Sequence, residues 1–376
     1  MNNLKKYILF VFLIENLLIS TKFSLGMAPF YVMLGIGLLL LMQPIIWKSE
    51  TIRECAPLYK LGAVYILYQF TLGLSTLNVN TALYLITKVV TFTIIIVSVV
   101  LNWDFYAQKT PPILSVIIII VLLSGAASTG DLNSGDRMRL GFGNENLMGS
   151  LASLCVAGVL YFWDKRKSVF YLLMLLGASY SLLASGSRNA ILYLGILVIV
   201  WTGFNLRKLI PAIILLFLLW GTISVLPLHL SGVERFKDTV EGNLGSTRDI
   251  EREATLLMIK ESPIKGWGFE AKNVGQAADL SELGSHNGYL DTIKFMGYPF
   301  GVLWFLVLIM SVLPLLKYAR SDQPFLRYHV AIVLSTMATA FFEGWFTGVH
   351  QFNTNIMFYS LAVLSTYKVR QSYLVE

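Results

Sequence analysis

Apolar stretches of membrane-spanning length recur along almost the whole chain. A bilayer core of about 30 Å requires about 20 predominantly apolar residues of helix. Twelve stretches come near that length. They lie at roughly 4–20, 25–46, 58–76, 82–101, 111–128, 146–163, 168–185, 189–203, 208–227, 294–316, 326–347 and 353–368. The pattern predicts an all-α, polytopic membrane helix bundle of about twelve transmembrane helices.

One polar segment, at about 228–293, is much longer than the other connections. It divides the chain into helices one to nine at 1–227, a large loop at 228–293, and helices ten to twelve at 294–376. The first apolar stretch has no small-residue cleavage site, so we expect a retained helix and not a signal peptide.

The basic residues alternate strongly between the two sets of helix ends, which predicts the orientation. One set holds sixteen lysines and arginines, and the opposite short connections hold four, namely Lys22, Arg137, Arg139 and Arg188. Basic residues accumulate on the cytoplasmic side. Both termini are therefore expected in the cytoplasm, and the loop at 228–293 outside, in a multi-pass membrane protein.

The composition narrows the function classes. Of 376 residues, 56% are hydrophobic and 14% charged, with a net charge of +7. These values exclude a soluble enzyme, a disulfide framework and a disordered chain. The positive charge follows from topology, so no nucleic-acid partner is expected. The chain has no GxxxxGK[ST] phosphate loop and only short cytoplasmic connections, so we expect no nucleotide and no other cofactor.

Three of the four outward cations in short connections are arginines beside small or polar residues. They lie in Asp136-Arg137-Met138-Arg139-Leu140-Gly141 and in Ser185-Gly186-Ser187-Arg188-Asn189. A guanidinium binds oxyanions through a planar fork, which suits a phosphate at a membrane surface. The alternative for Arg188 is a role at a helix end or against lipid headgroups. Three arginines together favour a site.

The long loop is predicted to contain one amphipathic helix. Ser246-Thr247-Arg248-Asp249 resembles a capping box, and Pro263 and Gly266 end the helix. Its apolar face is predicted to consist of Ile250, Ala254, Leu257 and Met258. Arg248 falls in the first turn, where the helix end also favours an anion. Arg252 shares a face with Arg248 but has two glutamates beside it, which favours a solvated ion pair.

His286 stands where the long loop re-enters the membrane, in Gly284-Ser285-His286-Asn287-Gly288-Tyr289-Leu290-Asp291. Histidine is the side chain best suited to accept a proton near neutral pH. A single histidine at a membrane interface more often has a structural role than a catalytic one. His229 and His350 are also predicted outside and His329 inside, without close spacing, so no metal site is expected.

Two carboxylates interrupt predicted spans, and burying them is costly. Glu343 lies near the outer end of the eleventh span, where it could orient an arginine or a histidine. Glu15, beside Asn16 in the first span, is expected to have a partner inside the bundle.

Four segments together resemble the bacterial O-antigen ligase and polymerase family, over about residues 130–310. The segments are Arg139-Leu140-Gly141-Phe142-Gly143-Asn144-Glu145-Asn146, Ser185-Gly186-Ser187-Arg188, Ser246-Thr247-Arg248 with Glu261-Ser262-Pro263-Ile264-Lys265-Gly266-Trp267-Gly268, and Ser285-His286-Asn287-Gly288-Tyr289-Leu290. The helix plan also resembles the family's, with one large outer loop before the tenth helix. One departure is the single histidine before Asn287, where many relatives have two.

The resemblance implies a GT-C-like bundle and a metal-independent glycosyltransferase that uses a polyprenyl (undecaprenyl) diphosphate-linked donor. It implies that Arg188, Arg248 and, less directly, Arg139 bind the diphosphate, and that His286 is the general base. Further candidates for the site are Arg137, Asn146, Arg252, Asn287 and Glu343. A chain-length regulator is an implied partner.

Four functions remain open at this point. A polymerase in surface polysaccharide and lipopolysaccharide biosynthesis is favoured slightly, because polymerases are the commoner members of the family. An O-antigen ligase, with a lipid A core acceptor, would use the same residue types. A transporter or flippase of lipid-linked sugars would instead need charged sites near the membrane midplane, and a scaffold would give no reason for Arg188 or His286.

Overall fold

The structure is a computed structural model that describes residues 7–19, 26, 28–72, 79–129, 145–165, 168–207, 210–211, 213–214, 218, 247–269, 286–346, 348 and 351–373. Every regular element in these ranges is a helix. The α-helices are α2 (Ile8–Ile19), α3 (Ala28–Leu41), α4 (Ser49–Glu54), α5 (Ala56–Thr71), α6 (Val79–Leu101), α7 (Trp103–Gln108), α8 (Thr110–Thr129), α9 (Glu145–Lys165), α10 (Val169–Ala184), α11 (Arg188–Trp201), α14 (Thr247–Glu261), α15 (Gly288–Val312), α16 (Pro324–Thr339) and α17 (Phe352–Tyr373). Two 3-10 helices, η1 (Pro44–Trp47) and η5 (Leu313–Arg320), join them.

Helix α17 is the centre of the bundle. Every residue from Phe352 to Thr366 is buried, because α17 packs against α6, α16, α4, α5 and α2. A helix that is buried on all sides needs apolar or hydrogen-bonded residues all round. This explains why α17 carries both large apolar side chains and two buried asparagines, Asn353 and Asn355.

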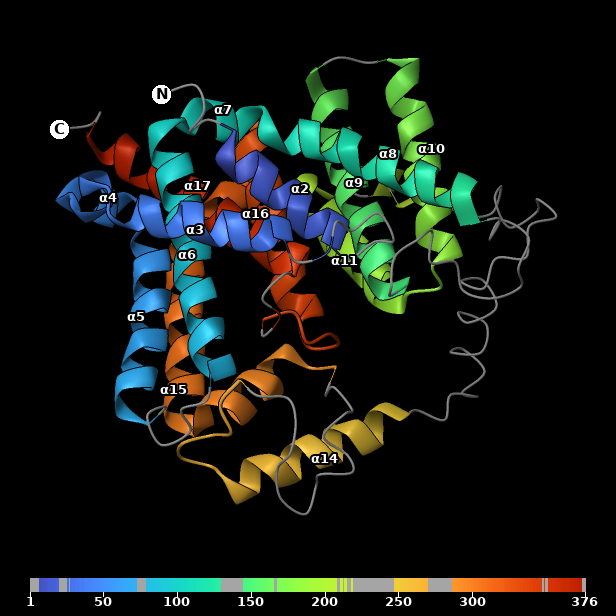
Figure 1. The fold of residues 1–376 in the computed structure, drawn as a ribbon. Coiled ribbons are helices and arrows are strands. Elements are labelled where there is room, and N and C mark those ends of the chain that lie inside the picture. Colours follow the sequence, from blue (N-terminus) through green and yellow to red (C-terminus); the bar gives the residue numbers. More distant parts are fainter. Residues whose placement is uncertain are drawn as a thin grey trace.

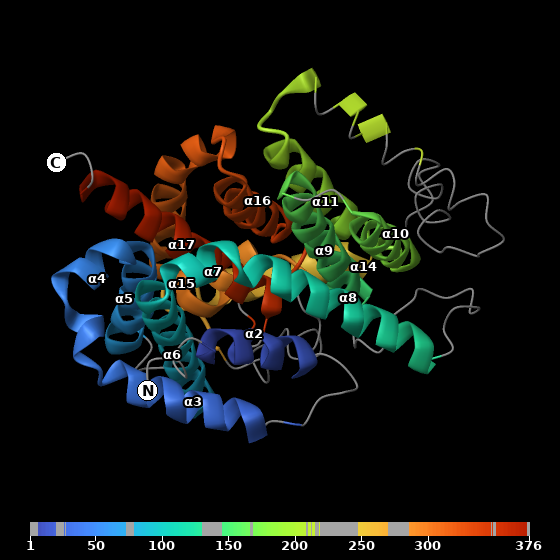
Figure 2. The same cartoon turned by 90° about the horizontal axis from the view of Figure 1, so that it is seen from above.

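Two groups of helices pack on either side of this centre (Figures 1 and 2). On one side α5, α6 and α15 run next to one another, and on the other α9 contacts α8, α10 and α11. Helix α16 joins them, since it contacts both α11 and α17. Helix α14 lies across one end of the molecule and packs against α15.

The helices coincide with eleven of the twelve predicted apolar stretches. The ninth, at about 208–227, lies mainly outside the described residues. Two boundaries near the candidate site were wrong. Helix α15 begins at Gly288 and not near 294, because Asn287 caps it there. Helix α16 ends at Thr339 and not near 347, because residues 340–346 turn to bind the start of α15.

Three of the described helical stretches are long and apolar enough to cross a membrane, namely Thr81–Leu101, Glu145–Phe162 and Gly288–Arg320. Shorter apolar helices, such as Val169–Ala184 and Arg188–Trp201, accompany them. Large apolar side chains on α5 and α10 point outward, Phe70 with 71% of its surface exposed and Leu173 with 62%. Such a surface fits contact with lipid. The architecture is that of a helical membrane protein, and the count of twelve crossings stays a prediction.

The polar pair in α2 has a partner inside the bundle, as expected. The side-chain amide of Asn355 in α17 donates to Oδ1 of Asn16 at 3.0 Å, and Asn16 in turn donates to a carboxylate oxygen of Glu15 at 3.3 Å. Since all three groups are buried, this link joins the first and last helices. Glu15 is therefore best explained by bundle assembly.

A kink near the start of α15 joins the long loop to the bundle. Gly297 has φ +71° and ψ 170° inside the helix. The free backbone groups pair with the turn after α14: Trp267 N–H donates to Lys294 O at 3.0 Å, and Gly268 N–H to Phe295 O at 2.9 Å. Tyr298 N–H donates to Pro263 O at 2.8 Å. The Pro-Ile-Lys-Gly-Trp-Gly segment at 263–268 is therefore a docking turn for the kink.

Only glycine fits at the centre of this contact. A Cβ on Gly297 would lie 2.1 Å from the carbonyl oxygen of Ile264, and a Cβ on Gly266 would lie 2.4 Å from that of Phe295. Both residues also have positive φ, at +71° and +66°, which strains any other side chain. The two backbones therefore meet without side chains between them.

We expect Gly297→Ala to lower the free energy of unfolding by about 1–3 kcal/mol from backbone strain alone, with the clash adding to it. Thermal unfolding of the purified protein in detergent would measure the effect. Gly195→Ala is the matched control, because its Cβ would meet no atom within 4 Å and alanine favours a helix. Equal unfolding temperatures for the two variants would contradict this role of the kink.

Candidate active site

His286 stands directly before α15, where the chain enters the bundle. Its φ of +46° is left-handed, a conformation that is uncommon outside glycine and is often found at functional sites. Asn287 follows and caps α15, with Oδ1 accepting from the N–H groups of Tyr289 and Leu290, both at 3.0 Å. The imidazole is 36% exposed. It is thus anchored by its backbone and still open to a substrate.

Two buried carboxylates flank the imidazole. Nε2 of His286 lies 3.7 Å from Oε2 of Glu251 in α14, and Nδ1 lies 3.7 Å from Oε2 of Glu343. Only 9% and 6% of the two glutamate side chains are exposed. At this distance, and partly shielded from water, each carboxylate stabilises positive charge on the ring. The arrangement therefore favours proton acceptance by His286.

Glu343 is held by a backbone clamp and not by a helix. The N–H of Gly288 donates to Ala340 O at 2.8 Å and to Glu343 O at 3.0 Å, and Trp345 N–H also donates to Glu343 O, at 2.8 Å. A Cβ on Gly288 would approach Glu343 O and the Phe346 ring to 3.2 Å. The expectation that Glu343 belongs to the eleventh helix was therefore wrong. Glu343 lies beside His286, and its role in orienting that histidine stays a prediction.

Helix α14 forms where the loop helix was predicted, but its buried face differs. Ala254 and Met258 are buried as expected. Ile250 and Leu257 are not, with 56% and 50% of their surfaces exposed. The face against α15 instead carries Glu251, Ala254, Thr255, Met258 and Ile259. The reason is tertiary: the docking turn rotates α14 so that Glu251 meets His286.

The two predicted arginines of α14 have different positions on the helix. Arg248 is in the first turn, as expected, and its side chain lies outside the described residues. Arg252 is exposed at the edge of the buried face. Glu251, which was considered only as a partner for Arg252, faces His286 instead.

Arg188 begins α11, after a turn that α9 holds from one side. Ser187 caps the helix, its hydroxyl accepting from Ala190 N–H at 3.2 Å. Gly149 of α9 touches this turn, since a Cβ there would lie 2.6 Å from Oγ of Ser185. Arg188 is exposed. Asn146 lies one turn before Gly149, so these two candidates share one end of the bundle.

An aromatic contact connects this end of α11 to the clamp beside His286. The Tyr193 ring lies 6.0 Å from the Trp345 ring, and Trp345 is bonded to the Glu343 carbonyl. Figure 1 shows the first turn of α14 on the side of the molecule that α9 and α11 occupy. The structure thus brings His286, Glu343 and α14 together, and places Arg188 and Asn146 at the same end.

The remaining histidines and outward arginines add no described side chain to the site. Arg137, Arg139, His229 and His350 lie outside the described residues. His329 is buried and structural, with its ring nitrogens 3.0 Å from Ser360 Oγ and 3.1 Å from Ala107 O. Within the described ranges, no three His, Cys, Asp or Glu side chains group as metal ligands. That the protein needs no metal stays a prediction.

Lys88 is a buried cation that sequence reasoning missed. It is completely buried in α6, and Nζ donates to Gly348 O at 2.8 Å and lies 5.4 Å from the centre of the Tyr84 ring. Gly348 belongs to the connection that also carries Glu343. The sequence contained a signal for Lys88, because an ionisable residue within a predicted span is a functional candidate.

Asn189 is a second missed residue. Only 6% of it is exposed, and neither atom of its side-chain amide has a hydrogen-bond partner among the described residues. Buried amides are normally bonded, so this one points to a ligand or water. It follows Arg188 directly, which could have drawn attention to it.

Comparison with known proteins gives one finding. Residues 170–305 match a family model described as O-antigen ligase. The matched segment includes Arg188, Arg248 and His286. No curated protein matches the chain. The match supports the O-antigen ligase and polymerase family that the sequence motifs resemble, and with it a function in surface polysaccharide biosynthesis.

We expect Asn287→Ala to cost about 0.5–2 kcal/mol of stability through loss of the α15 cap, and Asn287→Asp to retain most of it. Hydrogen exchange at the amides of Tyr289 and Leu290 would check this, with faster exchange in the alanine variant. Should both variants protect these amides equally, the capping role would be wrong.

Proposed function

We propose that this protein, whose residues 170–305 match the O-antigen ligase model, transfers glycan from a polyprenyl diphosphate-linked donor to a sugar hydroxyl, at the outer face of the bacterial inner membrane. One observation carries the proposal. An accessible histidine is held between two buried carboxylates, each 3.7 Å away, at the start of α15.

The first step is activation of the acceptor. A sugar hydroxyl is a poor nucleophile until a base accepts its proton, and such a base contributes roughly 10²–10⁴-fold to the rate. His286 accepts the proton as the hydroxyl oxygen forms its bond to the anomeric carbon. Glu251 and Glu343 stabilise the imidazolium that results, much as a buried carboxylate does in a catalytic triad.

The second requirement is stabilisation of the leaving group. The bond between the anomeric carbon and the diphosphate oxygen breaks, and its electron pair stays on the diphosphate. Guanidinium groups near low-dielectric lipid stabilise that charge strongly. Arg188 and Arg248 are assigned to this role, Arg248 with help from the first turn of α14. Arg139, Arg137 and Asn146 are further contacts for the donor.

The donor is already activated, so the reaction needs no ATP. The proposal includes no metal, because the arginines are assigned the stabilisation of the diphosphate. Direct displacement with a single base inverts the configuration at the anomeric carbon. Arg252, exposed on α14, is the weakest member of the set, and Asn287 serves the site by capping α15.

The acceptor decides between two functions. We favour a polymerase, which extends lipid-linked glycan, over a ligase, which joins the glycan to lipid A core. The residue types do not separate these, since only the acceptor differs. Purified protein in vesicles would be given lipid-linked donor, with and without lipopolysaccharide core. Longer lipid-linked products support a polymerase, and product on core alone would rule it out.

In that assay we expect His286→Gln to lower the rate by roughly 10²–10⁴-fold and Arg248→Ala by about 10²-fold or more. Arg320→Ala is the control, because Arg320 is exposed at the far end of α15 and η5. Unfolding temperatures would confirm that the variants fold. Glycan joining that survives both active-site changes would reject the enzyme and favour a transporter.

We expect Glu343→Gln to lower kcat by roughly 10- to 100-fold, because it removes one charge that stabilises the imidazolium, while KM for the donor stays near its wild-type value. Glu343→Asp should recover part of the loss. A change in KM alone would instead mean that Glu343 acts on substrate binding.

A further inference from the structure

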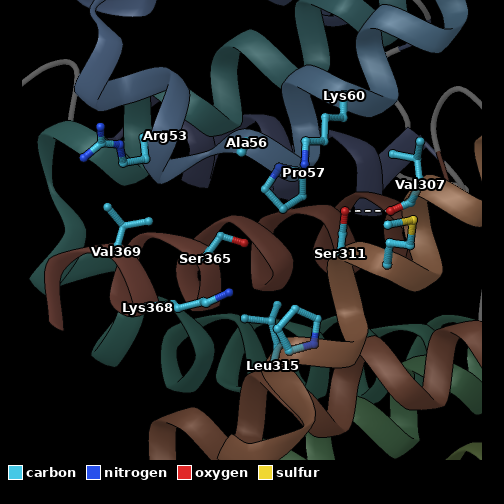
Figure 3. A pocket seen from close by; sticks show the side chains of 12 residues that line it. Arg53, Ala56, Pro57, Lys60, Val307, Ser311, Leu315, Ser365, Lys368 and Val369 are labelled. Atoms are coloured by element: carbon cyan, nitrogen blue, oxygen red, sulfur yellow. Dashed lines mark hydrogen bonds between the residues drawn. The ribbon is translucent and has the colours of Figure 1, made fainter. Parts of the chain in front are cut away.

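A cavity of about 320 Å³ lies between α4, α5, α15, η5 and α17 (Figure 3). Its lining residues are Arg53, Ala56, Pro57, Lys60, Val307, Met310, Ser311, Pro314, Leu315, Ser365, Lys368 and Val369. The walls are thus mostly apolar, while the polar members are three cations and two hydroxyls. None of the described acidic side chains lines it.

Two lysines and one hydroxyl supply the polar character that a ligand would meet. Figure 3 shows Lys368 reaching from α17 into the cavity, with Lys60 on α5 across from it. Neither lysine pairs with a carboxylate among the described residues. Ser365 is 6% exposed, and its Oγ has no hydrogen-bond partner within the described part of the chain. A buried hydroxyl normally has one.

The nearby charged side chains do not pair with Lys60 or Lys368, so both lysines can bind a ligand. Glu54 is already paired with Arg370, whose Nε lies 2.9 Å from Oε1. Arg53 directs its Nη1 to the hydroxyl of Tyr373 at 2.9 Å. The cavity is therefore lined by two lysines that no described acid neutralises, while Arg53 is directed to Tyr373, and it is suited to a single anionic group.

The cavity lies toward the ends of α5 and α15 that are farther from the kink. Along the part of α15 beyond the kink, the rise from Tyr298 to Val307 is roughly 14 Å at 1.5 Å per residue. Helix α5 runs the same way, because Pro57 lines the cavity while Tyr68 donates to Phe295 O beside the kink. Arg53, Lys60 and Lys368 line the cavity and belong to the helix ends predicted to face the cytoplasm, so we assign the cavity to the leaflet opposite the candidate active site.

We propose that this cavity binds the headgroup of an anionic glycerophospholipid in the leaflet opposite the candidate active site. The phosphodiester lies between Lys60 and Lys368 and accepts a hydrogen bond from Ser365. The acyl chains run along Val307, Met310 and Pro314. Basic pockets between membrane helices are suited to such headgroups.

The apolar rim favours a lipid over a free phosphate. Met310 has 70% of its surface exposed next to the cavity, and Pro314 beside it is exposed too. These side chains add nothing to the binding of inorganic phosphate. They offer contact area to acyl chains, whose burial contributes about 0.8 kcal/mol per methylene group.

The test uses the full-length protein, purified in neutral detergent and titrated with phosphatidylglycerol while native mass spectrometry records bound lipid. Phosphatidylcholine and inorganic phosphate are the comparison probes. We expect Lys60→Gln and Lys368→Gln each to weaken phosphatidylglycerol binding about fivefold. Lys317→Gln, a nearby exposed lysine outside the cavity, should leave it unchanged.

Ser365→Ala is the sharpest variant. Its hydroxyl has no partner in the protein alone, so its loss should leave the unfolding temperature unchanged or raised, yet weaken phosphatidylglycerol binding about tenfold or more. The proposal fails if phosphatidylcholine binds as tightly, if Lys317→Gln weakens binding as much as the cavity variants do, or if inorganic phosphate competes as an equal ligand. This readout is independent of glycan transfer, so it stands apart from the proposed activity.

Discussion

The candidate active site depends on one backbone contact, between the docking turn at 263–268 and the kink of α15. Backbone amides must find partners inside a protein, and a kink releases several of them. The turn supplies those partners, with Trp267 and Gly268 donating to carbonyls that the kink leaves open. Because the contact is glycine on glycine, its geometry leaves little freedom. It sets the rotation of α14 and hence the position of Glu251.

Around the candidate site, the acidic and basic groups have different proposed roles. Glu251 and Glu343 lie against His286, where a proton would arrive. The arginines assigned to the diphosphate lie in the first turns of helices, Arg188 in α11 and Arg248 in α14, where free backbone N–H groups also favour an anion.

The two ends of the bundle carry different kinds of polar residues. At the end of His286, polar residues are tied to backbone groups by caps and clamps, as at Asn287 and Gly288. At the other end, long cationic side chains surround a cavity open to an apolar rim. Such a difference is expected of a membrane protein, in which basic residues accumulate at the cytoplasmic end and the proposed active site lies at the other end.

The sequence by itself determined the helices and the candidate residues. Hydrophobic runs located eleven helices, though not all of their boundaries, because burying backbone in lipid leaves helix as the available structure. The capping signal before α14 and the His286 segment were also visible locally. The sequence did not predict that Glu251 faces His286, that Glu343 lies in a turn, or that Ile250 and Leu257 are exposed. Those features follow from how α14 and the 340–346 turn dock on α15, contacts between residues far apart in the chain, which no local pattern encodes.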